Sequence, residues 1–258
     1  MLTSLHNEKV KHARALAHQR KARGRHRQFV VEGVHLLQEA ERAGIQPALI
    51  FCTEAFYGSP AGARIVERWA SLVELVSDKV MASLSDTVTP QGVLSVVPFL
   101  NLEASKRDLI LLIDNLRDPG NVGALLRSAL AAGVDEALIS PNSVDLYAPK
   151  VVRSAMGAHF RLPARDDLDW SSIAACVAAL PVLLADAAGE IEYDRWDWRK
   201  PSVLIVGGEA EGASPAGRAL ATHRIRIPMR GGTESLNAAV AGSVILFEAA
   251  RQRRQTIA

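Results

Sequence analysis

The stretch LILLIDNLRDPGNVGALLRSALAAG, residues 109–133, decides the fold class of the larger part of the chain. It opens on an unbroken apolar run, which is typical of a strand buried on both faces of a parallel sheet. Pro119 and Gly120 then favour a tight turn, and small and apolar residues follow at helical spacing. Asn121 is suited to cap this helix through its side-chain oxygen. We therefore predict a strand, a turn and a helix of an α/β fold.

Further apolar runs with the character of strands continue the pattern along the chain. They are LILLID (109–114), ALIS (137–140), VLLAD (182–186), VLIVGG (203–208) and RIRIPM (224–229). Helical patterns separate them, which predicts a mainly parallel sheet covered on both faces. A smaller α/β unit precedes them and ends near Leu100, and the polar segment NLEASKRD links the two parts. We predict two domains, 1–100 and 106–258, with the boundary at about residue 105.

The composition of the 258 residues favours a soluble, cytoplasmic protein without a metal. Hydrophobic residues make up 48% of the chain, which is enough to bury a core. No run approaches eighteen apolar residues, and the polar start has no apolar region of a secretion signal. Cys52 and Cys176 match no CxxC or Cys/His metal spacing, so we expect two separate buried thiols.

Positive charge is concentrated near the start of the chain. Eight basic residues with no acid between them are Lys9, Lys11, Arg14, Arg20, Lys21, Arg23, Arg25 and Arg27. Subtracting these eight charges from the net charge of +2 leaves −6 for all other residues. Such a cluster attracts polyanions, so we predict that it binds the phosphate backbone of a nucleic acid. The alternative is a solvated, partly disordered arm. A membrane-surface helix is disfavoured because few positions between the charges are apolar.

Three loops that follow predicted strands are candidate sites, because ligands of parallel sheets bind beyond the carboxyl ends of the strands. In the first loop and its helix, turn chemistry does not explain Arg127, which lies among apolar neighbours. A surface arginine with a packed aliphatic stem is the alternative explanation. In the second loop, 206–214, the glycines allow a close approach of backbone to ligand. A plain strand-to-helix turn capped by Ser214 would leave its Gly-Gly-Glu unexplained.

The second loop matches neither GxGxxG nor the phosphate-binding GxxxxGK[ST] pattern, which disfavours dinucleotides and nucleoside triphosphates. The third loop follows Ile227 and leads to a long helix for which Ser235 is the expected N-cap. Asn237 is a poor helix former with an amide free to bond outward. The small residues Ala238, Ala239, Ala241 and Gly242 suit close packing against another helix or a second subunit. Arg251 and Arg253 near the helix end either meet phosphates or compensate the helix dipole.

Together the three loops resemble a known family. The patterns are N-x-x-D-P-G-N-x-G-x-x-x-R (115–127), G-G-E-x-x-G (207–212) and I-P-M-x-G-x-x-x-S-L-N (227–237). They are similar to the motifs of the SpoU/TrmH family of RNA ribose 2′-O-methyltransferases, in the SPOUT superfamily. Residues 1 to about 100 resemble the L30e-like RNA-binding domain that many members carry.

The resemblance implies a C-terminal deep trefoil knot, bound S-adenosylmethionine and a homodimer packed through the catalytic domain. By motif position, the cofactor contacts are Gly207, Ile227 and Leu236, and the catalytic-site residues are Asn121, Arg127, Glu209, Ser235 and Asn237. We expect Arg127 to hold the target phosphate and the 2′-oxygen while Ser235 and Asn237 orient the reacting groups.

The expected substrate is 23S ribosomal RNA, and transfer RNA is the alternative substrate. Two alternatives from other classes also stay open. A non-catalytic RNA-binding or ribosome-assembly protein could keep the fold, and the basic cluster fits it equally well. A small-molecule methyltransferase would leave the basic cluster without a use.

Overall fold

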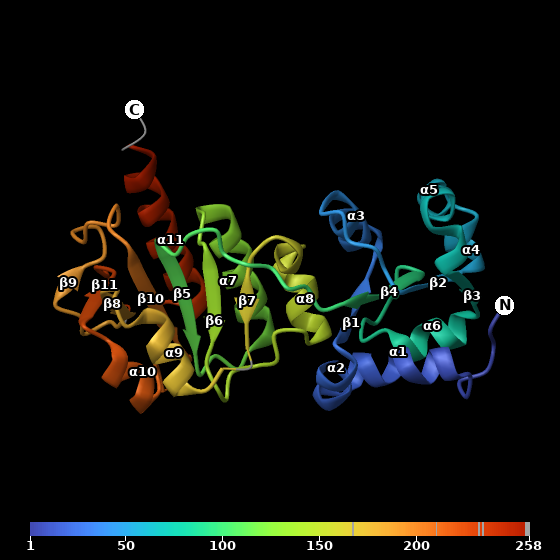
Figure 1. Cartoon of the computed structure of the whole chain (residues 1–258), viewed down its shortest axis with the longest axis horizontal. Helices are drawn as coiled ribbons and strands as arrows, with labels where there is room; N and C mark the ends of the chain where they lie inside the picture. Colours follow the sequence, from blue (N-terminus) through green and yellow to red (C-terminus); the bar gives the residue numbers. More distant parts are fainter. Residues whose placement is uncertain (167, 210, 232, 234, 256–258) are drawn as a thin grey trace. The chain divides into compact units, whose positions relative to one another are not determined.

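The computed structural model describes residues 1–166, 168–209, 211–231, 233 and 235–255. The chain forms two compact units (Figure 1). Unit 1 comprises Met1–Leu100 and Tyr147–Phe160, and unit 2 comprises Asn101–Leu146 and Arg161–Ala258. Each unit is therefore built from two separate stretches of the chain.

Unit 1 is built on a four-stranded sheet with the order β1-β4-β2-β3. Strand β4 is antiparallel to both β1 and β2, and β2 is parallel to β3. Its elements are α1 (Glu8–His18), α2 (Arg20–His26), β1 (Gln28–Glu32), α3 (Val34–Arg42), β2 (Leu49–Thr53), α4 (Glu54–Tyr57), α5 (Pro60–Trp69), the 3-10 helix η1 (Ala70–Leu72), β3 (Val73–Val76), α6 (Asp78–Leu84), β4 (Val93–Pro98), α8 (Pro149–Ala155) and the 3-10 helix η2 (Ala158–Phe160).

The alternation of side chains along β1 determines how the helices cover this sheet. Val30 packs with residues of α1 and α6 in one buried cluster. Phe29 and Val31 point to the opposite face and pack with residues of α3 and α8. Both faces of the sheet are therefore buried, as the sequence pattern predicts for an α/β unit.

The basic cluster forms two ordered helices instead of a disordered arm. Val10, Ala13 and Leu16 on α1 are fully buried and anchor the helix on the sheet. Arg23 on α2 is only 5% exposed, and its guanidinium donates to the backbone oxygens of Leu16 (2.5 Å) and Ala17 (3.2 Å). Arg23 thus differs from the expectation for an RNA contact, because its donors are used inside the unit.

The segment Tyr147–Phe160 belongs to unit 1, whereas the sequence pattern assigned it to the second domain. Val152 and Phe160 are buried against Phe29, so the segment completes the apolar face of the first sheet. Arg153 forms ion pairs with Asp86 and Glu32 of the same unit. Long-range apolar burial of this kind leaves no mark on the local sequence pattern.

Unit 2 is built on a seven-stranded sheet with the order β7-β6-β5-β10-β8-β11-β9. Every strand pair in it is parallel, which confirms the predicted parallel α/β sheet. Its elements are β5 (Leu109–Asp114), α7 (Pro119–Ala132), β6 (Glu136–Ile139), β7 (Ala164–Arg165), α9 (Trp170–Val177), β8 (Val182–Ala185), β9 (Ile191–Glu192), β10 (Ser202–Gly207), α10 (Pro215–Leu220), β11 (His223–Arg226) and α11 (Ala238–Arg254). The two-residue edge strands β7 and β9 were not predicted.

Helices cover both faces of the second sheet (Figure 1). Ile110 and Leu112 of β5 pack with residues of α9 and α10 on one face. On the other face α11 packs against α7, and Gly242 makes this possible because a Cβ there would lie 2.6 Å from Leu125 Cδ1. The Ser243 hydroxyl donates to Ser128 Oγ across the same contact (2.8 Å). The small residues of α11 thus serve helix packing, one of the two uses that we predicted.

Both cysteines are free thiols, as expected from their spacing. Cys52 is fully buried in unit 1, and burial raises the pKa of its thiol to about 11. Cys176 in unit 2 is partly buried. None of the helices in the described part of the chain combines the length and apolar character needed to span a membrane.

Candidate functional site

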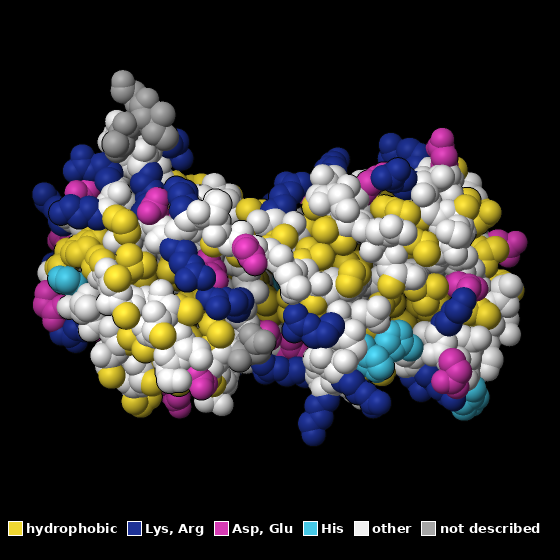
Figure 2. All heavy atoms as spheres, in the orientation of Figure 1, with side chains coloured by type: hydrophobic (Ala, Val, Ile, Leu, Met, Phe, Trp, Pro, Cys, Tyr) yellow, Lys and Arg dark blue, Asp and Glu magenta, His cyan; other side chains and the backbone are white. Residues whose placement is uncertain are grey.

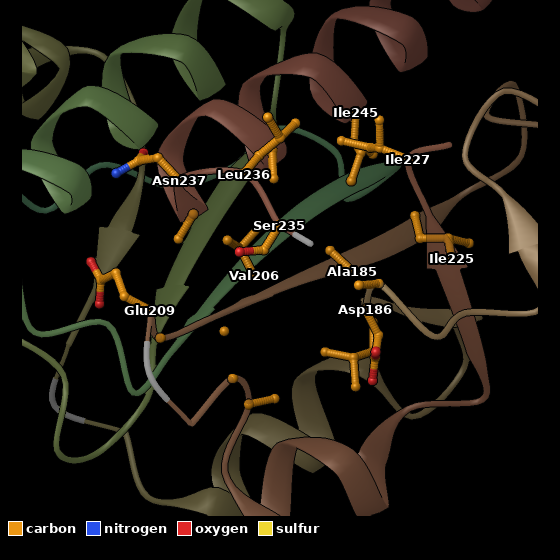
Figure 3. Close-up of a pocket in the computed structure, with 18 of the residues that line it drawn as sticks. Ala185, Asp186, Val206, Glu209, Ile225, Ile227, Ser235, Leu236, Asn237 and Ile245 are labelled. Atoms are coloured by element: carbon orange, nitrogen blue, oxygen red, sulfur yellow. The ribbon is translucent and has the colours of Figure 1, made fainter. Parts of the chain in front are cut away.

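A cavity of about 670 Å³ lies at the carboxyl ends of β8, β10 and β11, which all end at the same edge of the parallel sheet. This volume is in the range of small-molecule and cofactor sites. Six residues predicted from the sequence line it: Gly207, Glu209, Ile227, Ser235, Leu236 and Asn237. Figure 3 shows Asn237 and Glu209 on one side of the cavity and Asp186 and Ile225 on the other, with Ser235 between them.

The walls of the cavity are apolar and its edges are polar. Ile225, Ile227 and Ile245 contribute branched aliphatic side chains from β11, the loop after it and α11. Glu209 and Asp186 contribute carboxylates. The site therefore suits a ligand that has an apolar body and at least one polar or positively charged group.

The glycines of the second loop are required by close backbone contacts. A Cβ at Gly207 would lie 2.3 Å from the backbone nitrogen of Ala213, and one at Gly208 would lie 2.3 Å from the backbone oxygen of Asn115. No side chain fits these positions unless the backbone moves. The glycines therefore allow the second loop to fold back on itself and to lie against the first loop.

Asp114, the last residue of β5, is fully buried beneath the loops of the site. It accepts hydrogen bonds from Ser140 Oγ and from the backbone nitrogen of Ser214, both at 2.7 Å. Ser214 in turn caps α10, whose first residue is Pro215, so the capped turn of the alternative interpretation is present in the second loop. A buried carboxylate at the end of β5 thus joins the second loop to the sheet.

Asn237, and not Ser235, caps the long C-terminal helix. Its Oδ1 accepts from the backbone nitrogens of Ala239 (3.0 Å) and Val240 (3.2 Å), so α11 begins at Ala238. Asparagine is as good an N-cap as serine. The cap orients the amide, and its Nδ2 donates to Asn121 Oδ1 (3.0 Å).

Asn121 also differs from its predicted role, because Asp118 caps α7 by accepting from the Asn121 backbone nitrogen (2.8 Å). The Asn121 side chain is left to bond across the site, and its Nδ2 donates to Glu209 Oε1 (2.6 Å). A chain of hydrogen bonds therefore runs from Asn237 through Asn121 to Glu209. It links one residue from each of the three predicted loops, which are far apart in sequence.

Arg127 is the one predicted catalytic-site residue that this arrangement leaves outside. It is exposed on α7, almost two turns beyond Asn121, and it does not line the cavity. No hydrogen bond or ion pair joins it to any residue that the structure describes. Its guanidinium is therefore free to bind an external anion.

Besides Glu211 of the second loop, two polar residues that line the cavity were missed by the sequence analysis. Asp186 directly follows β8, and Arg218 lies on α10. Asp186 carried a signal, because it ends the apolar run VLLAD at the carboxyl edge of the sheet. Arg218 carried none, because its position depends on how the second loop folds.

Arg253 was predicted to contact RNA, but it is bound inside unit 2. Its Nε donates to the backbone oxygen of Trp198 (2.8 Å), and its NH2 donates to that of Asp108 (2.7 Å). Burial lowers the pKa of this guanidinium from its ordinary value. Arg253 therefore fastens the end of α11 to neighbouring loops.

Among the described residues, no cluster of three or more His, Cys, Asp or Glu side chains is arranged to hold a metal ion.

The parallel sheet and this cavity define an α/β protein with a ligand site built by glycine-containing loops at the carboxyl edge. The model of the SpoU rRNA methylase family matches residues 108–247, and the model of the MRM3-like substrate binding domain matches residues 7–95. The chain belongs to the SpoU rRNA methylase family.

Relatives share nearly the whole length of the chain. The 23S rRNA (uridine(2479)-2′-O)-methyltransferase of Streptomyces viridochromogenes is 31% identical, covering 96% of this chain and 91% of that protein. The mitochondrial rRNA methyltransferase 3 of Homo sapiens is 30% identical, covering 88% and 68%. The crystal structure of the SpoU methyltransferase AviRb from S. viridochromogenes with the cofactor AdoMet has a TM-score of 0.86 at 29% identity, covering 96% and 98%.

Proposed function

We propose that this protein is an S-adenosylmethionine-dependent methyltransferase that methylates a ribose 2′-hydroxyl of RNA, with 23S ribosomal RNA as its substrate. The observation that carries the proposal is the hydrogen-bonded chain Asn237–Asn121–Glu209 beside the cavity. Three motifs of the family meet there in space. The ribosomal RNA substrates named for these relatives support the choice of substrate.

The cavity fits S-adenosylmethionine in size and chemistry. Its volume of about 670 Å³ suits a ligand of this class. Gly207 and Ile227 would hold the cofactor with their backbones, and Leu236 would cover it. The bound cofactor supplies a methyl group on a positively charged sulfur, and the carboxylates of Glu209 and Asp186 favour positive charge nearby.

In the proposed reaction, side chains of the protein hold the ribose hydroxyl and the neighbouring phosphate. One hydrogen of Asn237 Nδ2 is used by Asn121, which leaves the second to orient an oxygen of the substrate. Ser235 lines the cavity beside it with a hydroxyl that both donates and accepts. Arg127 is assigned to the phosphate, because a guanidinium carries a permanent positive charge and is not a base under neutral conditions.

The proposed RNA-binding face of unit 1 consists of the exposed basic residues of α1 and α2. Arg14, Lys21, Arg25 and Arg27 are exposed, and Figure 2 shows dark blue side chains where these helices lie. Lys9 and Lys11 also belong to this face, although they pair with Glu74 and Glu8. Arg20 completes the set. The match to a substrate-binding domain over residues 7–95 supports this assignment, and an L30e-like fold is part of the proposal.

We further propose a homodimer through α11. Val240 and Phe247 are 49% and 46% exposed and lie two turns apart on one face of the helix. Exposed large apolar side chains on one face are a common mark of a protein interface. A second copy of the chain is the proposed partner. Arg251 lies one turn further on and remains a candidate RNA contact, although Glu248 pairs with it.

A C-terminal trefoil knot is also part of the proposal. The loops after β10 and β11 both line one cavity, and α11 returns from them to pack on α7. This return path is compatible with threading of the C-terminal segment, an exception to the rule that chains avoid knots.

Binding and methylation assays test the function together. We expect the purified protein to bind S-adenosylmethionine in titration calorimetry and to methylate unmodified 23S ribosomal RNA, with the 2′-O-methyl site mapped by mass spectrometry. Methylation of transfer RNA alone would contradict the substrate. Cofactor binding without methylation of either RNA would contradict the activity.

A further inference from the structure

We infer that Arg218 is a positioning residue that holds residues 207–209 and 211–214 of the second loop in the arrangement that lines the cavity. The inference rests on the proposed function in one respect, namely that the cavity binds S-adenosylmethionine. Arg218 lies on α10, outside all three motifs of the family resemblance. Its side chain spans the loop after β10 and the end of β8.

The guanidinium of Arg218 bonds to three groups at once. Nε donates to the backbone oxygen of Ala213 (3.0 Å), and NH2 donates to that of Glu211 (3.1 Å). NH1 donates to Asp186 Oδ2 (3.4 Å). The planar fork of an arginine matches acceptors on several sides, whereas a lysine ammonium cannot reach all three.

Gly212 shows that the loop is fitted to this side chain. Its φ of +66° favours glycine, and a Cβ there would lie 2.9 Å from Arg218 NH2. Gly212 also exchanges two backbone hydrogen bonds of 3.1 Å with Gly208. The narrow loop that carries Glu209 is thus closed at its base by Gly208 and Gly212, with the guanidinium packed against it.

The three hydrogen bonds of the Arg218 guanidinium form a clamp on the second loop, and Asp186 is the partner that the sheet holds in place. Its backbone nitrogen donates to the backbone oxygen of Ile225 (2.9 Å), and its Oδ1 accepts from the Ala188 nitrogen (2.9 Å). The carboxylate side chain is only 19% exposed. Arg218 therefore ties Glu211 and Ala213 of the second loop to a residue anchored at the edge of the sheet.

Loss of this clamp should loosen the loop before any ligand is present. Gly207 and Glu209 would then have to be ordered when the cofactor binds, which weakens binding. Ser235 and Asn237, which orient the ribose, lie outside this loop. Bound cofactor would order the loop again and restore the bond between Asn121 and Glu209, so turnover with saturating cofactor should change much less. Affinity and turnover thus separate a positioning role from a catalytic one.

The test compares Arg218→Ala and Arg218→Lys with the control Arg224→Ala. Arg224 is a matched control because its side chain is 45% exposed, against 48% for Arg218, and it also pairs with one carboxylate, that of Glu190. Amide hydrogen exchange of 207–214 is measured without ligand, and the Kd of S-adenosylmethionine is measured by calorimetry. The Lys variant keeps the charge, so it provides a result even where the Ala variant folds poorly.

We expect both Arg218 variants to exchange faster in 207–214 and to raise the Kd about tenfold, the size expected for lost hydrogen bonds from a charged donor. The turnover number at saturating cofactor should stay within about twofold, and Arg224→Ala should match the parent protein. Parental exchange and Kd in both Arg218 variants would overturn the inference, as would equal effects in the control. If the parent protein did not bind the cofactor, the proposed function would fail while the exchange data still tested the clamp.

Discussion

At the scale of single residues, the site depends on amides and glycines more than on charges. Asn121 both accepts and donates within one hydrogen-bonded chain, and its neighbours fix the direction of that chain. Glycine is needed at 207 and 208 because other segments of backbone occupy the space of a side chain. The geometry of the site therefore tolerates few substitutions that look conservative.

Asn121→Asp replaces the amide donor by a carboxylate next to Glu209. Because the bond to Glu209 Oε1 is lost and two carboxylates face each other, we expect methyl transfer to fall at least about tenfold. Initial rates on unmodified 23S ribosomal RNA measure this. Asn101→Asp, at an exposed position of unit 2, is the control and should keep the parental rate. A parental rate for Asn121→Asp would show that methyl transfer does not need the hydrogen-bonded chain Asn237–Asn121–Glu209.

Arg127→Ala should abolish methyl transfer and leave the Kd of S-adenosylmethionine unchanged, because Arg127 does not line the cavity. Gly207→Val should instead weaken the binding of S-adenosylmethionine, since a Cβ at Gly207 would lie 2.3 Å from a backbone nitrogen. Titration calorimetry and methyl-transfer rates separate the two effects. Normal methylation by Arg127→Ala would contradict the phosphate role.

At the scale of elements, the start of each of the two helices at the site, α7 and α11, is determined by the polar residue that caps it. Asp118 caps α7 and Asn237 caps α11, so the side chain of Asn121 is released to the site. The other end of α11 is held by Arg253 and by an ion pair of Glu248 with Arg251. One helix thus contributes both to the site and to the stability of unit 2.

Glu248→Gln tests this end of the helix through its pH dependence. Two hydrogen bonds from Arg251 and one from Gln252 hold the pKa of Glu248 below its ordinary value of 4.5. Since the folded pKa is lowered, the carboxylate stabilises the fold above the unfolded pKa and loses this contribution as the pH falls through the folded value. The melting temperature of the parent should exceed that of the variant near pH 7 and converge with it below about pH 4. A constant difference over this range would contradict the assignment.

At the scale of the whole molecule, unit 1 is completed by a segment from the second half of the chain. Val152 and Phe160 bury the apolar face that Phe29 presents, and Tyr147 stacks on Phe99 with ring centroids 3.7 Å apart. A boundary drawn in sequence at about residue 105 therefore separates residues that share one core.

A fragment of residues 1–105 should consequently be much less stable than unit 1 in the full chain. Without the segment, Phe29 and Val97 lose part of their cover, and losing buried aromatic packing costs about 3–5 kcal/mol per large side chain. Circular dichroism melting and binding of a hydrophobic dye measure the loss. A fragment that melts cooperatively at the temperature of the full chain would contradict the role of the segment.

Much of the fold and part of the site could be predicted from local patterns. Continuous apolar runs mark buried parallel strands, and glycines that follow them mark the cavity, because both properties depend on near neighbours in sequence. The motif resemblance pointed to Glu209, Ser235 and Asn237, which line the cavity. The roles of Asp186 and Arg218 could not be predicted, since each depends on an acceptor or donor from a distant segment.

The sequence by itself determined the parallel sheet, the loops that form the site and the family, because hydrophobic periodicity and short motifs are local. Only the tertiary structure decided which polar groups are used up and which remain available. Arg23 and Arg253 bond to buried carbonyl oxygens, whereas Arg127 is left free of partners among the described residues. The physical reason is that a buried donor must find an acceptor, and the acceptors come from segments that only folding brings together.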